Sequence, residues 1–313
     1  MSCDWVAWTA FLSARRRGRA GGKGGFDSFP RVFGGTSRHN GCPLDRNAPA
    51  MPTQNQAPAT EAEWWIRTAE GALFAKSWTP DAAGAAPIIL FHDSLGSVDL
   101  WRSFPQRLAA ETNRRVIAYD RLGFGRSDAH PGRLALDFVA AEARDGIPPL
   151  CDQLGVSEFI ACGHSVGGGM AVETAARFPE RCRALVTIAA QAFVEERTLA
   201  GIRDAKGDFQ DPANVARLAR YHGDKARWVL DAWTETWLSP AFADWTLDRA
   251  LAAVRCPVLA LHGDRDEYGS SAHPERIAAG RGAARLLPDT GHVPHREQET
   301  LVVDAIRNFL NGV

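Results

Sequence analysis

The sequence predicts an α/β fold with a mostly parallel sheet of about eight strands and helices on both faces. Short apolar runs recur along the chain, and stretches with apolar residues at helical spacing separate them. Runs of four or five apolar residues are typical of parallel strands that are covered on both faces. Because such runs alternate with helical stretches, the connections are expected to cross over from strand to parallel strand.

The strands are expected in the following order. The first two form a hairpin, because residues 64–67 and 73–78 have strand character and flank the turn residues Glu70 and Gly71. The later apolar runs, which predict the parallel strands, are residues 87–91, 115–119, 159–162, 184–188, 258–261 and 284–287.

Helices are expected where apolar residues recur every three or four positions. One such stretch covers residues 100–108, and another covers residues 138–154 with an interruption at Pro148-Pro149. A third, residues 301–310, ends the chain. The sheet is therefore expected to be covered by helices from all of the connections.

One connection is too long for a simple crossover. About 60 residues separate the strand that ends near Ala190 from the one that begins near Pro257, which predicts a separate helical element at 191–251. This element holds four of the ten tryptophans. For each of these rings, packing of the helical layer onto the sheet is the favoured interpretation, and a role in an aromatic lid is the alternative.

Composition excludes several classes of function. The chain has 313 residues, 45% hydrophobic content and a net charge of -1, so it presents no basic field for nucleic acid or an anionic membrane. Six cysteines without a C-x-x-C pair indicate reduced, buried thiols, not a zinc site or a disulfide framework. No apolar run reaches the roughly 18 residues of a membrane span. We expect a soluble, cytoplasmic protein that acts on a small molecule; the oligomeric state is left open.

Residues 1–60 differ in composition from the rest. They are rich in Gly, Arg, Pro and Asn, which predicts a disordered N-terminal extension. An Arg-rich targeting peptide is a second interpretation, although no apolar core with a cleavage site follows the arginines. The interpretation ranked first is that Met51 is the true start of the protein.

The pentapeptide Gly163-His164-Ser165-Val166-Gly167 lies between an apolar run and a stretch of small residues. A strand, a sharp turn and a helix in this order hold a serine in an exposed, strained bend, and the flanking glycines avoid clashes at Cβ. Ser165 is therefore a candidate nucleophile. An ordinary tight turn between a strand and a helix is the alternative interpretation.

A serine nucleophile needs a base to accept its proton and an acid to orient that base. Two candidate acids, Asp264 and Asp266, follow the run at 258–261, and two candidate bases, His292 and His295, follow the run at 284–287. Because loops that leave the same edge of a parallel sheet lie together, these groups can reach Ser165.

The chain resembles the α/β-hydrolases over residues 61–313. The resemblance is carried by His92-Asp93-Ser94-Leu95-Gly96, by residues 120–127 (DRLGFGRS), by the Gly163–Gly167 elbow, and by the loops that contain Asp266 and His292. It implies a core of residues 61–190 and 252–313, with a helical cap of residues 191–251 inserted after the sixth strand. In the family such a cap lies over the active site, which makes Trp233 and Trp237 candidate substrate contacts.

The resemblance also implies roles for single residues. The family spacing from Gly263 selects Asp266 as the acid, with Asp264 as a turn residue and Glu267 solvated. His292, which follows Gly291, is the base; His295 caps or packs a helix.

The backbone N–H groups of Val166 and Ser94 form the oxyanion hole, His92 orders its loop through hydrogen bonds, and His164 is structural. The family's usual His-Gly pair is His92-Asp93 here, so a side chain stands where the backbone must curve. Because aspartate tolerates unusual backbone angles, we expect the oxyanion hole to survive.

The activity that the resemblance implies is hydrolysis of a carboxylic ester, lactones and enol-lactones included, through an acyl-enzyme and without a metal or organic cofactor. Serine at the elbow argues against the epoxide hydrolases and haloalkane dehalogenases, whose nucleophile is aspartate. Hydrolysis of a carbon-carbon bond in ring-cleavage products is one alternative. A cofactor-free haloperoxidase or perhydrolase is another, since it also fits Gly167-Gly168-Gly169. A non-catalytic relative that binds a ligand or a partner is disfavoured, because no triad residue is missing.

Overall fold

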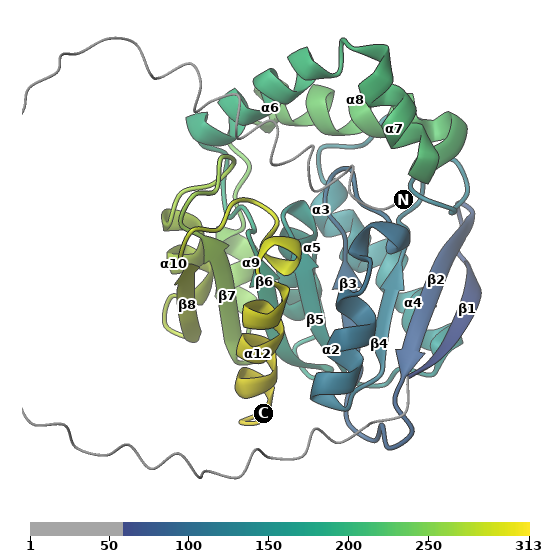
Figure 1. The fold of residues 1–313 in the computed structure, drawn as a ribbon, viewed down its shortest axis with the longest axis vertical. Helices are drawn as coiled ribbons and strands as arrows, with labels where there is room; N and C mark the ends of the chain where they lie inside the picture. The colour runs from purple at the N-terminus through teal and green to yellow at the C-terminus, as the bar shows by residue number, and fades with distance from the viewer. Residues whose placement is uncertain (1–58) are drawn as a thin grey trace, which may run out of the picture. The chain divides into compact units, whose positions relative to one another are not determined.

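An eight-stranded sheet runs through the part of the chain that the computed structural model describes, residues 59–313 (Figure 1). The strand order is β1-β2-β4-β3-β5-β6-β7-β8. The strands are β1 (Thr60–Arg67), β2 (Ala72–Thr79), β3 (Ile88–Phe91), β4 (Val116–Tyr119), β5 (Phe159–His164), β6 (Cys182–Ile188), β7 (Val258–Gly263) and β8 (Gly282–Leu287). β2 pairs antiparallel with β1 and β4, and all other neighbouring strands are parallel. The predicted sheet is confirmed; the expectations for residues 1–58 lie outside the described residues.

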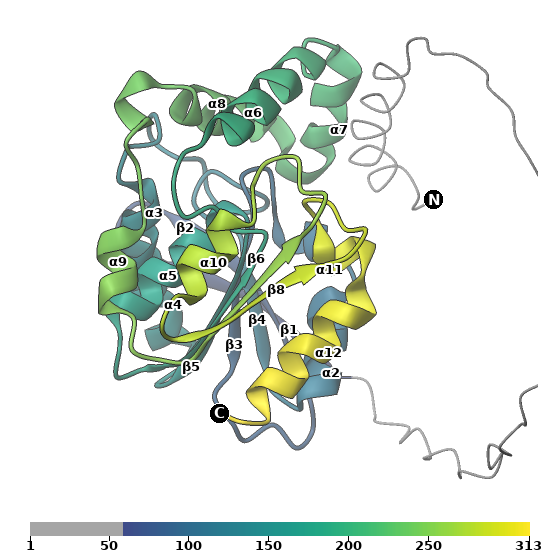
Figure 2. The same cartoon turned by 90° about the vertical axis from the view of Figure 1, so that its left-hand side faces the viewer.

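Helices cover both faces of this sheet (Figure 2). One face is covered by α2 and α12, and the other by α3, α4, α5, α9 and α10. The bounds of the helices are α2 (Phe104–Thr112), α3 (Phe138–Ala141), α4 (Ile147–Leu154), α5 (Val166–Arg177), α6 (Glu196–Asp208), α7 (Pro212–His222), α8 (Ala226–Trp237), α9 (Asp248–Ala253), α10 (Ala272–Ala278), α11 (Pro294–Glu297) and α12 (Glu299–Leu310). In the described residues, no helix is both long and apolar enough to cross a membrane.

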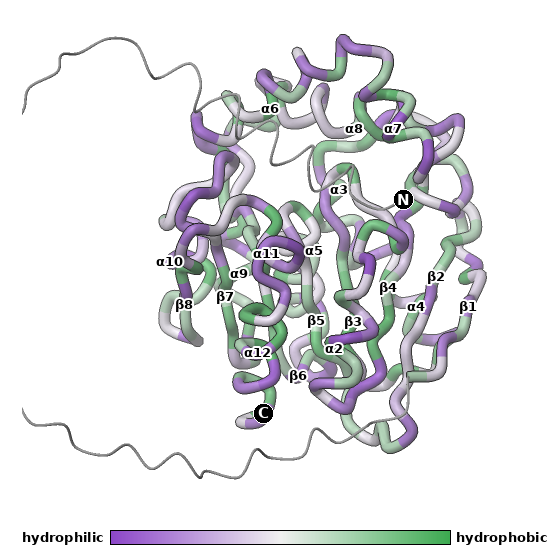
Figure 3. The backbone as a smooth tube through the Cα atoms, in the orientation of Figure 1, coloured by the Kyte–Doolittle hydropathy of each residue, from purple (hydrophilic) through white to green (hydrophobic). Residues whose placement is uncertain are grey.

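The central strands β3, β4 and β5 are mostly hydrophobic (Figure 3) because they are buried along their whole length. In β3, Ile88 and Leu90 join the core beneath α2 and α12, whereas Ile89 and Phe91 join the core beneath α4 and α5. Successive side chains of a strand point to opposite faces, so one short apolar run supplies both cores.

β8 departs from the expectation that the strands of the parallel sheet are covered on both faces. It is the last strand of the sheet, and five of its six residues are exposed. Leu286, for example, keeps half of its surface accessible. An edge strand with one neighbour has less cover than a central strand, which explains the difference.

The interruption expected at Pro148-Pro149 is a π-helical turn (Glu142–Gly146) just before the prolines. Both prolines lie in the first turn of α4, where helices tolerate proline. Because proline has no N–H, the carbonyl groups of Arg144 and Asp145 lack their ordinary i+4 donors, and a wider turn precedes α4.

The long connection after β6 is helical, as predicted. It forms α6, α7 and α8, which lie together beyond the carboxyl ends of the parallel strands in both views (Figures 1 and 2). The boundary expected between residues 251 and 252 falls inside α9. This helix packs against α5 and so belongs to the layer on the sheet.

Candidate active site

Ser165 lies at a sharp bend between β5 and α5. Its backbone angles are φ 54° and ψ -127°, a conformation that costs a residue with a side chain about 1–3 kcal/mol. The bend brings backbone segments very close together. A Cβ on Gly163 would lie 2.1 Å from the carbonyl oxygen of Gly167, and a Cβ on Gly167 would lie 2.2 Å from that of Phe91. The glycines on either side of Ser165 are therefore required by packing.

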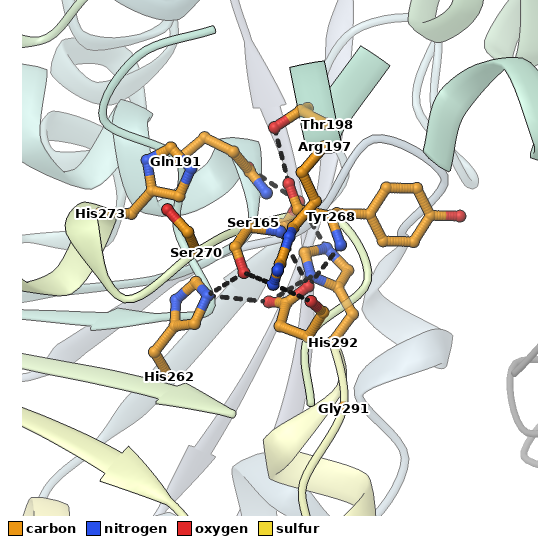
Figure 4. A network of polar contacts seen from close by, with 12 residues as sticks. Ser165, Gln191, Arg197, Thr198, His262, Tyr268, Ser270, His273, Gly291 and His292 are labelled. Carbon is orange, nitrogen blue, oxygen red and sulfur yellow. Dashed lines mark hydrogen bonds and ion pairs between the residues drawn. The ribbon is translucent and has the colours of Figure 1, made fainter. Parts of the chain in front are cut away.

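The structure brings together the three residues that the sequence selected. His292 Nε2 lies 3.0 Å from Ser165 Oγ, and His292 Nδ1 lies 2.9 and 3.0 Å from the two oxygens of Asp266 (Figure 4). Asp266 follows β7 and His292 follows β8, so both loops leave the same edge of the parallel sheet as Ser165. Such a chain of contacts can move a proton from a hydroxyl group to an imidazole.

The negative charge of Asp266 and a positive charge on His292 stabilise each other. Burial lowers the pKa of the His292 imidazole, but the charge and hydrogen bond of Asp266, together with the charges of Glu267 and Asp93, outweigh burial and raise that pKa to about 9. Burial raises the pKa of Asp266, and the charge and hydrogen bond of His292 more than reverse this effect, so the pKa lies below its usual value. Asp266 is therefore ionised and stabilises an imidazolium on His292.

Asp266 is held by its own loop. Its Oδ1 accepts the backbone N–H groups of Tyr268 at 2.7 Å and Gly269 at 3.2 Å, and His262 Nε2 lies 3.1 Å from its Oδ2. Burial lowers the pKa of His262, which the Asp266 charge only partly opposes. A neutral His262 with its proton on Nε2 therefore donates to Asp266 and helps to hold the carboxylate beside His292.

The alternative residues have other environments. Asp264 is exposed, and its carboxylate accepts the N–H of Thr290 at 3.3 Å, so it links two loops where we expected it to cap its own backbone. Glu267, expected to be solvated, is half-buried, and burial raises its pKa. His295 is buried against the rings of Trp101 and Phe104, in agreement with the predicted packing role.

Gln191 was not identified from the sequence. It lies buried just beyond the end of β6, and its Oε1 accepts a hydrogen bond from the Ser165 hydroxyl group at 3.3 Å. The hydroxyl group has one proton, so Gln191 and His292 compete for it. The one signal in the sequence was that Gln191 follows a strand at the same sheet edge as the triad.

The loop after β3 is ordered by His92, as predicted. Nε2 of His92 accepts the N–H of Arg121 at 3.2 Å, which leaves the proton on Nδ1 to donate to the carbonyl oxygen of Asp93 at 2.8 Å. Burial, the largest cause, lowers the pKa of His92 well below its usual value and keeps the ring neutral.

The two N–H groups expected to form the oxyanion hole are available. Val166 is the first residue of α5, where a backbone N–H has no partner within the helix. The N–H groups of Leu95 and Gly96 are bonded to Asp93, whereas no hydrogen bond from the Ser94 N–H is found within residues 59–313. The arrangement is therefore compatible with the predicted oxyanion hole.

The two predicted substrate contacts differ in their surroundings. Trp237 is 3% exposed, and its ring packs against Phe242 and Trp245 at centroid distances of 5.3 and 5.6 Å. Trp233 is partly buried beside Tyr268 at 6.1 Å, and the Tyr268 ring lies 4.7 Å from that of His292 (Figure 4). Substrate contact by either tryptophan stays a prediction.

Helix α6 directly contacts the loop that contains Asp266 and Tyr268. The Arg197 guanidinium group donates to the carbonyl oxygen of Asp266 at 3.2 Å, and the Thr198 hydroxyl group donates to that of Tyr268 at 2.6 Å. A Cβ on Gly201 would lie 2.8 Å from the Tyr268 ring. The helical insertion and the acid loop therefore form one packed unit.

Comparisons with known proteins agree with this fold. A family model described as the alpha/beta hydrolase fold matches residues 86–211. A putative non-heme haloperoxidase of Mycobacterium phage D29 is 37% identical over 108 residues, 34% of this chain and 37% of that protein. The dihydrolipoyllysine-residue acetyltransferase component of the acetoin cleaving system of Pseudomonas putida is 27% identical over 245 residues, 72% of this chain and 64% of that protein. The matches thus span between about a third and two thirds of these relatives' lengths.

Among solved structures, the enol-lactonase from Burkholderia xenovorans LB400 superposes with a TM-score of 0.60 at 20% identity and covers 79% of this chain and 99% of that one. Sheet order, sharp serine bend and loop positions define an α/β protein with a serine, a histidine and an aspartate at one sheet edge. The chain has the α/β-hydrolase fold, and the family model of that description matches residues 86–211.

Proposed function

We propose that the protein is a serine hydrolase that cleaves a small carboxylic ester, lactones and enol-lactones included. The observation that carries this proposal is the continuous set of contacts from Ser165 Oγ through His292 to Asp266, at 3.0 and 2.9 Å. The strained backbone of Ser165 supports it, because strain of this kind is typical of a functional site.

The reaction proceeds in two halves. The Ser165 oxygen attacks the carbonyl carbon while His292 Nε2 accepts the hydroxyl proton, and the negative charge on the former carbonyl oxygen is stabilised by the N–H groups of Val166 and Ser94. The carbon-oxygen bond to the alcohol then breaks, and His292 donates its proton to the leaving oxygen. Water attacks the acyl-enzyme by the same route, which releases the acid and restores Ser165.

Helices α6 to α8 act as the cap in this proposal. They carry Trp233, which lies next to Tyr268 and so close to His292. Apolar rings near the nucleophile favour an ester with an apolar acyl or alcohol group.

A fluorophosphonate probe tests the proposal directly, because it reacts with an activated serine. The wild-type protein is expected to be labelled and to hydrolyse p-nitrophenyl esters, and Ser165→Ala is expected to lose both properties with unchanged thermal stability. Asp264→Asn is the matched control and should keep both. A folded wild-type protein that is not labelled would contradict the proposal.

Perhydrolysis is the second candidate, supported by the similarity to the putative haloperoxidase of Mycobacterium phage D29 over 108 residues. Hydrogen peroxide would then replace water in the attack on the acyl-enzyme and release a peracid. Peracid formation from an ester and peroxide, compared with hydrolysis of that ester, distinguishes the two. Turnover of a dienone acid in preference to every ester would indicate carbon-carbon hydrolysis instead.

A further inference from the structure

His164 lies between two hydrogen-bond acceptors that belong to different loops. Its Nδ1 is 3.1 Å from Asp93 Oδ2, and its Nε2 is 2.7 Å from the carbonyl oxygen of His292. A carbonyl oxygen can only accept a hydrogen bond, and the same is true of an ionised carboxylate. Both nitrogens of His164 must therefore donate, and the ring that satisfies this geometry carries two N–H groups and a positive charge.

The state of Asp93 agrees with this geometry. Burial raises the pKa of Asp93, but the hydrogen bond and charge of His164, assisted by Arg296, reverse this and hold the pKa well below its usual range. The His164 side chain is 2% exposed and that of Asp93 is 25% exposed. Because a buried charge without a partner is strongly destabilising, a charged His164 requires Asp93.

The other groups that face His164 do not replace Asp93. The rings of His292 and His295 lie 5.2 and 4.6 Å from it, and Trp101 lies 6.4 Å away. Burial, the largest cause, lowers the pKa of His295 well below its usual value, so that ring is neutral. Asp93 is thus the anion in direct contact with His164.

Asp93 also holds its own loop. While Oδ2 faces His164, Oδ1 accepts the N–H of Leu95 at 2.8 Å, and the backbone carbonyl of Asp93 accepts from the Arg121 guanidinium group at 2.9 Å. The expected difficulty of a side chain at this position is absent: Asp93 is not among the residues with positive φ in the described part of the chain. Aspartate therefore fits without backbone strain where the family usually has glycine.

We propose that Asp93 and the buried His164 form a partly buried ion pair that fixes the oxyanion loop and the His292 backbone against the nucleophile elbow. Three segments meet in this pair: Asp93 precedes Ser94, His164 precedes Ser165, and His292 contributes its carbonyl oxygen. Asp93 is a positioning residue, since it acts through its neighbours. The inference rests on the proposed function, because it assigns Ser94 and His292 their roles in the reaction.

Two substitutions at Asp93 separate charge from hydrogen bonding. Asp93→Ala removes both contacts, whereas Asp93→Asn can still accept from Leu95 and can donate its amide N–H to a neutral His164. We expect Asp93→Ala to lower kcat by about tenfold to 100-fold, the cost of a misplaced catalytic group, with KM little changed. Asp93→Asn should recover most of that loss. Asp99→Asn, which changes an exposed carboxylate in the same segment, is the control and should leave kcat unchanged.

The protonation of His164 is measured independently by NMR of the ¹⁵N-labelled wild-type protein at pH 7, with the ring nitrogens assigned through their coupling to the His164 Cβ protons. Two protonated ring nitrogens are expected, and one in Asp93→Asn. A single protonated nitrogen in the wild-type protein would overturn the proposal, even if Asp93→Ala fails to fold, and so would a folded Asp93→Ala with wild-type kcat. Failure of the proposed function is read separately, from absent fluorophosphonate labelling, because the NMR signals do not depend on turnover.

Discussion

Asp266→Asn is the substitution that most directly tests the arrangement of the site. The change keeps the size and position of the side chain but removes the charge that faces His292 Nδ1 at 2.9 Å. It also replaces one acceptor oxygen by an N–H donor. Two effects therefore lower the activity: the His292 imidazolium loses electrostatic stabilisation, and the His292 ring loses the tautomer that can accept a proton from Ser165.

The electrostatic loss follows from the pKa of His292, which the Asp266 carboxylate, assisted by the charges of Glu267 and Asp93, raises against burial from 6.5 to about 9. This net difference corresponds to about 3 to 4 kcal/mol of stabilisation of the imidazolium, or roughly 300-fold, and Asp266 is its largest favourable cause. In addition, the Asn amide N–H favours the tautomer of His292 that has its proton on Nε2, which cannot accept the proton of Ser165. In serine proteases the two effects together cost about 10⁴-fold in kcat, and we expect a loss between these two values.

The assay is kcat/KM for a p-nitrophenyl ester from pH 5 to 10. In the wild-type protein kcat/KM should rise as His292 loses its proton, with a midpoint near its pKa of about 9. Without the Asp266 charge the midpoint should move to lower pH. Asp264→Asn, in the same loop, should change neither value. An Asp266→Asn protein with activity within about tenfold of wild type and an unmoved midpoint would refute this reasoning.

Four further outcomes are expected. Ser165→Gly should raise the free energy of unfolding by about 1 kcal/mol relative to Ser165→Ala, because glycine relieves the strain at this bend; thermal denaturation of both inactive proteins measures it. Gly167→Ala should destabilise by about 2 kcal/mol or more in urea, since its Cβ would lie 2.2 Å from a β3 carbonyl oxygen, while Gly84→Ala, which meets nothing within 4 Å, should not. Gln191→Glu places a carboxylate near Ser165 Oγ and His292, so kcat/KM at pH 8 should fall about tenfold or more; an unchanged value would exclude the assigned contact. Because the folded-state pKa of His292 is raised to about 9, its contribution to stability is fully present below its unfolded value and is lost as pH rises through 9; a His292→Gln protein should lack this loss of about 3 to 4 kcal/mol.

The parts of the fold that the sequence predicted are those determined by local pattern. Apolar runs mark β3 to β7 because their burial on both faces requires such runs. The exposure of β8 could not be read in this way, since position within a sheet depends on how many neighbours a strand has. An interruption at Pro148-Pro149 was predicted, but its π-helical form was not, because that form reflects carbonyl groups left without donors by the two prolines.

The residues of the candidate site also include some that the sequence predicted and some that only the fold brings together. Ser165, Asp266 and His292, which the structure brings together, could be selected from the sequence because each lies in a short motif just after an expected strand. Gln191 has no motif, and only the fold brings it next to Ser165. The contact between Asp93 and His164 joins residues 71 positions apart, and no periodicity or spacing in one sequence relates them.

The close contact between Gly201 and the Tyr268 ring limits which positions can be changed to alter substrate preference. Thr198 and Gly201 of α6 contact the loop that carries Asp266, so these two positions are not freely variable. A larger residue at Gly201 would displace the Tyr268 ring, which lies 4.7 Å from that of His292. Because Trp233 of α8 also lies beside Tyr268, diversity is best introduced at positions away from both of these contacts.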